Sequence, residues 1–153
     1  MALLAIDLGL KTGLALYGRD GRLQWYRSQN FGSVARLKRG AHGVVSSIET
    51  LEHLVAEGDR KLGEIWGRLA SRRGASVRII GAHTWRQSVY LARHRRQIGD
   101  PKRFADEFAR RVVSWSKAPQ PTSLRHDAAE AILAGLWGVL EVGWLDALPQ
   151  ELR

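Results

Sequence analysis

Short apolar runs separated by glycine-containing turns dominate the first part of the chain and predict β-strands. Leu3–Ile6 and Thr12–Tyr17 are apolar runs on either side of a connection that contains Gly9, a pattern typical of two buried strands joined by a tight turn. Leu23–Phe31 follows the turn Arg19–Gly21 and predicts a third strand. Such short connections favour antiparallel pairing of these strands.

Helical spacing of apolar residues becomes frequent after these strands. The pattern predicts a helix over 34–51, a strand over 53–58, a helix from Asp59 to about 73 and a strand over 76–80. After these elements it predicts a helix from Thr84 to about 91 and a basic loop over 92–99. Two more helices follow, one that starts at Asp100-Pro101 and a last one over 123–142. The 53–58 segment could also continue the preceding helix. We expect a single α/β domain over 1–153, with a mixed five-stranded sheet flanked by helices.

The charge balance favours an anionic partner. The chain has 24 lysines and arginines against 15 aspartates and glutamates, which gives a formal net charge of +9. A basic surface of this kind is typical of nucleic-acid-binding proteins. The absence of cysteine excludes disulfides and thiolate metal sites and is compatible with a reducing cytoplasm. No apolar run is long enough for a membrane span, and no signal peptide is evident, so we expect no membrane partner.

Acidic residues stand at the ends of several predicted elements. Asp7 ends the first strand and Glu57 ends the fourth, so parallel neighbouring strands would bring both carboxylates to one edge of the sheet. Asp127 and Glu130 share one face at the start of the last helix. Converging carboxylates suit Mg²⁺ or Mn²⁺, and two such ions would activate water for phosphodiester hydrolysis. The neighbouring His126 could be a surface residue or could assist the metal site.

Each acid also has a purely structural interpretation. Asp7 could begin a turn, and Glu57 could be an exposed helical residue. Asp127 and Glu130 could complement the positive end of a helix. For nucleic-acid contacts, the predicted side chains are Lys11, Arg93, Arg95, Arg96, Lys102 and Arg103. Trp85 and Tyr90 are candidates for stacking on bases.

Two motifs carry a family resemblance. Ala5-Ile6-Asp7-Leu8-Gly9 and Arg125-His126-Asp127-Ala128-Ala129-Glu130-Ala131 resemble the first and last motifs of RuvC-type Holliday junction resolvases, in the RNase H-like superfamily. The resemblance implies an RNase H-like fold, a Mg²⁺-dependent endonuclease and a homodimer. It matches Asp7, Glu57, Asp127 and Glu130 to the metal-binding positions of the family, and Lys102 to a lysine that contacts DNA.

By this resemblance, the substrate would be branched DNA, a four-way junction cut by paired nicks in DNA recombination and repair. The protein would act in the cytoplasm of a bacterial or phage-infected cell, at the nucleoid. Two features depart from the family pattern: the loop after Glu57 is short, and Glu130 stands where the family more often has aspartate. The compact size and short loops resemble a phage or prophage relative. The alternatives are a nuclease of the YqgF type that acts on another nucleic acid, and a DNA-binding module without catalysis.

Overall fold

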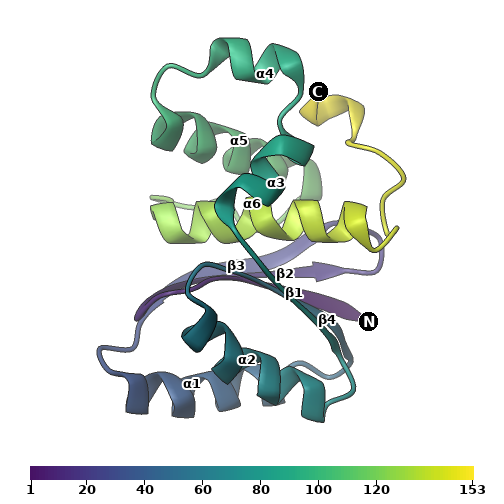
Figure 1. The fold of residues 1–153 in the computed structure, drawn as a ribbon. Helices are drawn as coiled ribbons and strands as arrows, with labels where there is room; N and C mark the ends of the chain where they lie inside the picture. The colour runs from purple at the N-terminus through teal and green to yellow at the C-terminus, as the bar shows by residue number, and fades with distance from the viewer.

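One mixed sheet divides the molecule into two helical layers in the computed structural model, which describes residues 1–153 (Figure 1). In chain order the elements are β1 (Ala2–Asp7), β2 (Lys11–Gly18), β3 (Leu23–Asn30), α1 (Val34–Ser47), β4 (Leu51–Glu57), α2 (Arg60–Arg72), β5 (Ser76–Ile80), α3 (Ala82–Val89), α4 (Ala92–Gln97), α5 (Pro101–Ser116), α6 (His126–Glu141) and a final 3₁₀ turn, η1 (Gln150–Leu152).

The sheet has the strand order β3-β2-β1-β4-β5. β1 pairs antiparallel with β2, and β2 pairs antiparallel with β3. β4 runs parallel to β1 on its other side, and β5 runs parallel to β4. The predicted α/β fold with a mixed five-stranded sheet is therefore confirmed. The predicted fourth strand is also present, although it begins two residues earlier than expected.

Alternation along the strands assigns each side chain to one of the two layers. Leu4 and Ile6 of β1 pack in the layer that contains α1 and α2. Leu3 and Ala5 pack in the opposite layer, which contains α3, α5 and α6. The same alternation directs Asp7, the last residue of β1, toward the α6 side of the sheet. The position of the candidate site, described below, follows from this alternation of side chains.

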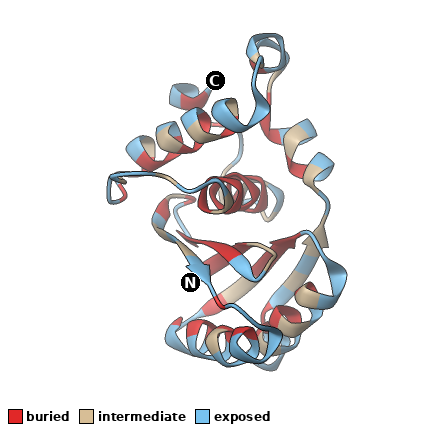
Figure 2. Cartoon of the chain, turned by 90° about the vertical axis from the view of Figure 1, so that its left-hand side faces the viewer, coloured by how far each residue is buried: buried red, intermediate tan, exposed pale blue.

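Helix α6 is the central element of its layer. It is buried over nearly its whole length (Figure 2), and it packs closely on the sheet because small residues face the strands. A Cβ at Gly135 would lie 2.3 Å from Cε2 of Tyr17. The Tyr17 hydroxyl donates a hydrogen bond to the backbone oxygen of Ile132 at 2.5 Å, which fixes the depth of the helix over β2.

The prediction of a basic loop over 92–99 is wrong, because residues 92–97 form helix α4. His94 explains the error: its ring is buried and packs edge-on against Phe108 at 5.1 Å. Its Nδ1 accepts a hydrogen bond from the Leu91 backbone N–H at 3.0 Å. Within this basic sequence, His94 therefore faces inward and anchors the short helix α4.

Trp85 and Tyr90 belong to the same buried aromatic cluster, with their rings 5.5 Å apart. The prediction that they stack on bases is wrong, because neither ring is accessible.

Three helix boundaries also differ from prediction. α1 ends at Ser47 because β4 begins at Leu51; α3 begins at Ala82, with Gly81 rather than Thr84 as its N-cap; and α6 begins at His126. No helix combines the length and apolar character needed to cross a bilayer.

The close packing of α6 predicts a stability difference between two glycine substitutions in helices. Gly135→Ala should lower the free energy of unfolding by about 1–3 kcal/mol, because the added methyl group overlaps the Tyr17 ring. Gly43→Ala in α1 is the matched control: no atom lies within 4 Å of the added carbon, so higher helix propensity should stabilise the protein by up to about 1 kcal/mol. Urea denaturation of both variants measures the difference; equal effects would contradict this packing.

Candidate functional site

A row of residues crosses the sheet where β1 and β4 end. Ser28 pairs with Gly13, Gly13 with Asp7, and Asp7 with Glu57 in the strand registers. Because paired residues on neighbouring strands point to the same face, all four positions face the layer of α6. The structure therefore places Glu57 beside Asp7 at the end of a strand, rather than on an exposed helix.

The absence of a side chain at Gly13 allows α6 to reach this row. A Cβ at Gly13 would lie 1.9 Å from the backbone oxygen of Asp127, closer than two such atoms can approach. The first turn of α6 thus lies directly on the sheet. This contact brings Asp127 and Glu130, which are distant in sequence, to Asp7 and Glu57.

Asp7, which is half-buried, and Glu57, which is buried, form a carboxyl pair. Burial is the main cause that raises the pKa of Asp7 to about 8, followed by the charge of Glu57 and a hydrogen bond with it, and then by the charges of Glu130 and Asp127. Burial also raises the pKa of Glu57, although the hydrogen bond from Asp7 and the charges of Arg86 and His126 oppose it. In the absence of a cation, these raised pKa values favour one proton shared between the two carboxyls.

Glu130 is only 5% exposed, and its two oxygens have different surroundings. Oε1 accepts a hydrogen bond from Nη2 of Arg86 at 3.1 Å, and Nε2 of His126 lies 3.1 Å from the same oxygen. Oε2 is buried and has no hydrogen-bond partner. A buried carboxylate oxygen without a partner is unfavourable, so this atom marks a place where a positively charged ligand would be stabilised.

Sequence reasoning missed Arg86. Nothing in its sequence context distinguishes it from the other surface arginines, since it lies in the middle of the short helix α3. Its guanidinium lies over the ring of Trp85, 4.9 Å from the centroid, and extends from there to α6. Only the packing of α3 against α6 reveals the contact.

Asp127 is oriented by its own helix and by the sheet. Its Oδ1 accepts from the Ala128 backbone N–H at 2.7 Å, and its Oδ2 accepts from the Ser28 hydroxyl at 2.8 Å. The contact with Ala128 fits the structural interpretation, in which an acid complements the positive end of a helix. The contact with Ser28 additionally ties α6 to β3 within the same row.

The four carboxylates have the chemistry of a hard-cation site. No group of three or more histidine, aspartate or glutamate side chains is arranged to hold a metal ion. Asp127 and one oxygen of Glu130 are engaged with protein donors. The oxygen ligands nevertheless fit Mg²⁺ or Mn²⁺. The free Oε2 of Glu130 and the proton shared by Asp7 and Glu57 are features that a divalent cation would satisfy or replace.

A polar groove of about 770 Å³ lies beside these acids. No hydrophobic residue lines it; its lining residues are Lys11, Ser28, Asn30, Lys102, Arg125, His126 and Asp127. Asp127 and His126 belong to both the groove and the acidic cluster. Four of the seven lining residues are lysine, arginine or histidine, so the groove is suited to an anion.

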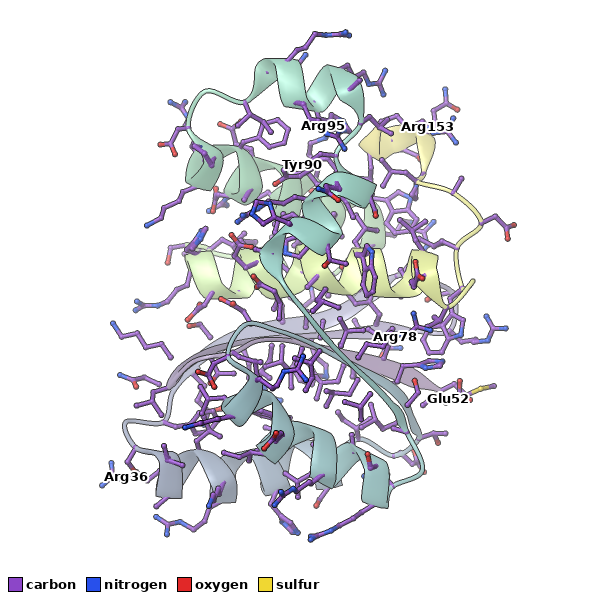
Figure 3. The ribbon with its side chains drawn as sticks, in the orientation of Figure 1. Arg36, Glu52, Arg78, Tyr90, Arg95 and Arg153 are labelled. Carbon is purple, nitrogen blue, oxygen red and sulfur yellow. The ribbon has the colours of Figure 1, made fainter.

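The structure brings only part of the predicted nucleic-acid-binding set to this groove. Lys11 and Lys102 line it, whereas Arg93, Arg95 and Arg96 lie on α4, beyond α5 from the sheet (Figure 1). Arg95, labelled in Figure 3, donates to the backbone oxygen of Gln87 at 2.5 Å. Arg103 pairs with Glu107 one turn further along α5. Ser28, Asn30 and Arg125 are lining residues that sequence reasoning missed.

Comparison of the chain with models of protein families finds no match, and comparison with curated proteins finds no similar sequence.

The raised pKa of Asp7 predicts a pH dependence of stability in the metal-free protein. Between the pKa of an unfolded aspartate, about 4, and the folded value of about 8, only the folded state holds this proton. The free energy of unfolding should therefore fall as pH rises from 5 to 8, by at most about 1.4 kcal/mol per unit from this group. Denaturation in EDTA across this range measures the slope.

Asp7→Asn should reduce that slope and make the protein more stable than the wild type above pH 8. Asp146→Asn changes an exposed loop carboxylate and should leave the slope unchanged. A wild-type slope identical to that of Asp7→Asn would show that Asp7 ionises normally.

Proposed function

We propose that this protein is a Mg²⁺-dependent endonuclease that hydrolyses phosphodiester bonds in branched DNA, with the four-way junction as its main substrate. The observation that carries the proposal is the juxtaposition of the carboxylate cluster, with its unpartnered Glu130 oxygen, and the cationic groove. Either feature alone is common. Together they resemble what phosphodiester hydrolysis requires, a cation-binding pocket adjoining a track for a polyanion.

The residues of the groove and those of the carboxylate cluster would have different roles. Lys11 and Lys102 would hold phosphate oxygens in the groove and so position the backbone beside Asp127. Asp7 and Glu57 would lose their shared proton on binding a divalent ion and become oxygen ligands together with Glu130. A bound Mg²⁺ would polarise the phosphate and lower the pKa of an attacking water.

The choice of branched DNA rests on the resemblance to RuvC-type resolvases and on the basic charge of the chain. The mixed five-stranded sheet flanked by helices is compatible with an RNase H-like fold. A homodimer, which the same resemblance implies, would supply two cleavage sites for paired nicks. DNA recombination and repair are the processes that would use such an activity.

Asp7→Asn tests the catalytic part of the proposal. The wild type should nick a labelled four-way junction in Mg²⁺ and leave it intact in EDTA. Asp7→Asn should reduce the cleavage rate at least ~100-fold, since a cation ligand is lost. Its affinity for the junction in EDTA should be unchanged or higher at pH 9, where the wild-type carboxyl is ionised. Asp146→Asn is the control; normal cleavage by Asp7→Asn would refute the proposal.

The same assay separates the alternative functions. Faster cleavage of an RNA–DNA hybrid than of the junction would indicate a nuclease of the YqgF type. Junction binding that is independent of Mg²⁺, with no cleavage of any substrate, would indicate a DNA-binding module.

The groove predicts which cations contact the phosphates. Lys11→Ala and Lys102→Ala should each weaken junction binding and reduce the slope of log K against log salt by about 0.9, the value for one lost phosphate contact. Arg93→Ala, on the exposed surface of α4, removes the same charge away from the groove and should have a smaller effect. Binding titrations in EDTA at several salt concentrations measure both quantities. A larger effect from Arg93 would move the interface to α4.

A further inference from the structure

We propose that Arg86 is a positioning residue, which holds one oxygen of Glu130 so that the other is presented to a divalent cation. This inference rests on the proposed function, because it concerns the same cation site. It assigns a role to a residue outside the four acids, on a helix that contributes none of them.

The hydrogen bonds of Glu130 are one-sided. Arg86 donates a hydrogen bond to Oε1 at 3.1 Å, and Nε2 of His126 lies at the same distance from that oxygen, while Oε2 stays buried without a partner. A carboxylate whose first oxygen is held by two such contacts cannot rotate freely about its terminal bond. The two contacts therefore determine where Oε2 lies, and its lack of any protein partner leaves it available to a ligand.

Glu130 needs such a restraint more than an aspartate would, since its side chain has one more rotatable bond. His126 shares its helix, at i and i+4, but its side chain is 43% exposed and forms one wall of the groove. Arg86 approaches from a different helix. Its guanidinium lies over the ring of Trp85, which is fully buried, so the donor is itself supported by the aromatic cluster.

The sign of the effect on metal affinity separates this role from simple electrostatics. Removal of a positive charge near a cation site should strengthen cation binding if charge alone mattered. Removal of a residue that orients a ligand should weaken it, typically by about 10–100-fold. The two interpretations of Arg86 thus predict opposite changes.

Calorimetric titration of the full chain with Mn²⁺ provides the test without any measurement of cleavage. Arg86→Gln should weaken Mn²⁺ binding by about 10–100-fold, and Arg86→Lys should restore part of it, because lysine can still donate to Oε1. Arg110→Gln is the matched control: this arginine is as exposed as Arg86 and pairs with Asp106 on α5, so its loss should leave Mn²⁺ affinity unchanged. Thermal melts in EDTA identify any variant that fails to fold, in which case Arg86→Lys, expected to bind Mn²⁺ less tightly than the wild type, carries the comparison.

A double-mutant cycle tests whether Arg86 affects Mn²⁺ binding through Glu130. In a Glu130→Gln background, Arg86→Gln should cause no further loss of Mn²⁺ affinity, since the residue it positions is already lost. Unchanged or tighter Mn²⁺ binding by Arg86→Gln, in a wild type that does bind Mn²⁺, would overturn this inference alone. A wild type that binds no Mn²⁺ would overturn the proposed function as well.

Discussion

The contact between the first turn of α6 and Gly13 of β2 is the constraint on which the candidate site depends. A side chain at this position would overlap the backbone of Asp127, so the helix would have to lie further from the sheet. Asp127 and Glu130 would move with it, away from Asp7 and Glu57. The absence of a side chain at Gly13 thus allows the acids of the sheet, Asp7 and Glu57, and the acids of α6, Asp127 and Glu130, to form one cluster.

The gathering of four acids, of which Glu57 and Glu130 are buried, is unfavourable unless the charges are compensated, and the structure supplies compensation in two ways. On the sheet, the raised pKa values of Asp7 and Glu57 favour one proton shared between them. On the helix, the guanidinium of Arg86 pairs with one oxygen of Glu130, and Nε2 of His126 lies 3.1 Å from the same oxygen. The site can therefore exist as a folded, charge-compensated arrangement. Oε2 of Glu130 is buried and has no hydrogen-bond partner. A bound cation would supply the missing contact.

The sequence was most informative where chemistry coincides with the end of a strand. Asp7 and Glu57 each follow an apolar run, and the parallel pairing of β1 with β4 places them side by side as predicted. Glu57 was ambiguous in sequence because the short apolar run Leu54–Ala56 that precedes it can belong to a helix or a strand. Pairing with β1 and β5, a tertiary property, makes it a strand.

Other parts of the site could not be predicted, because they depend on contacts between elements. Ser28 reaches Asp127 only through the register of β3 with β2. Arg86 reaches Glu130 only through the packing of α3 against α6. The basic run over 92–99 was predicted to be a loop because of its density of charge, whereas the buried ring of His94 anchors residues 92–97 as helix α4.

The site thus consists of a sheet half and a helix half, joined by few bonds. Asp7 and Glu57 are fixed by strand pairing, whereas Asp127 and Glu130 move with α6. The Ser28–Asp127 hydrogen bond joins the halves directly, and Arg86 ties Glu130 to α3, which follows the end of β5. Since a shared cation would need oxygens from both halves at fixed separations, small changes in these two contacts should affect cation binding more than they affect the fold.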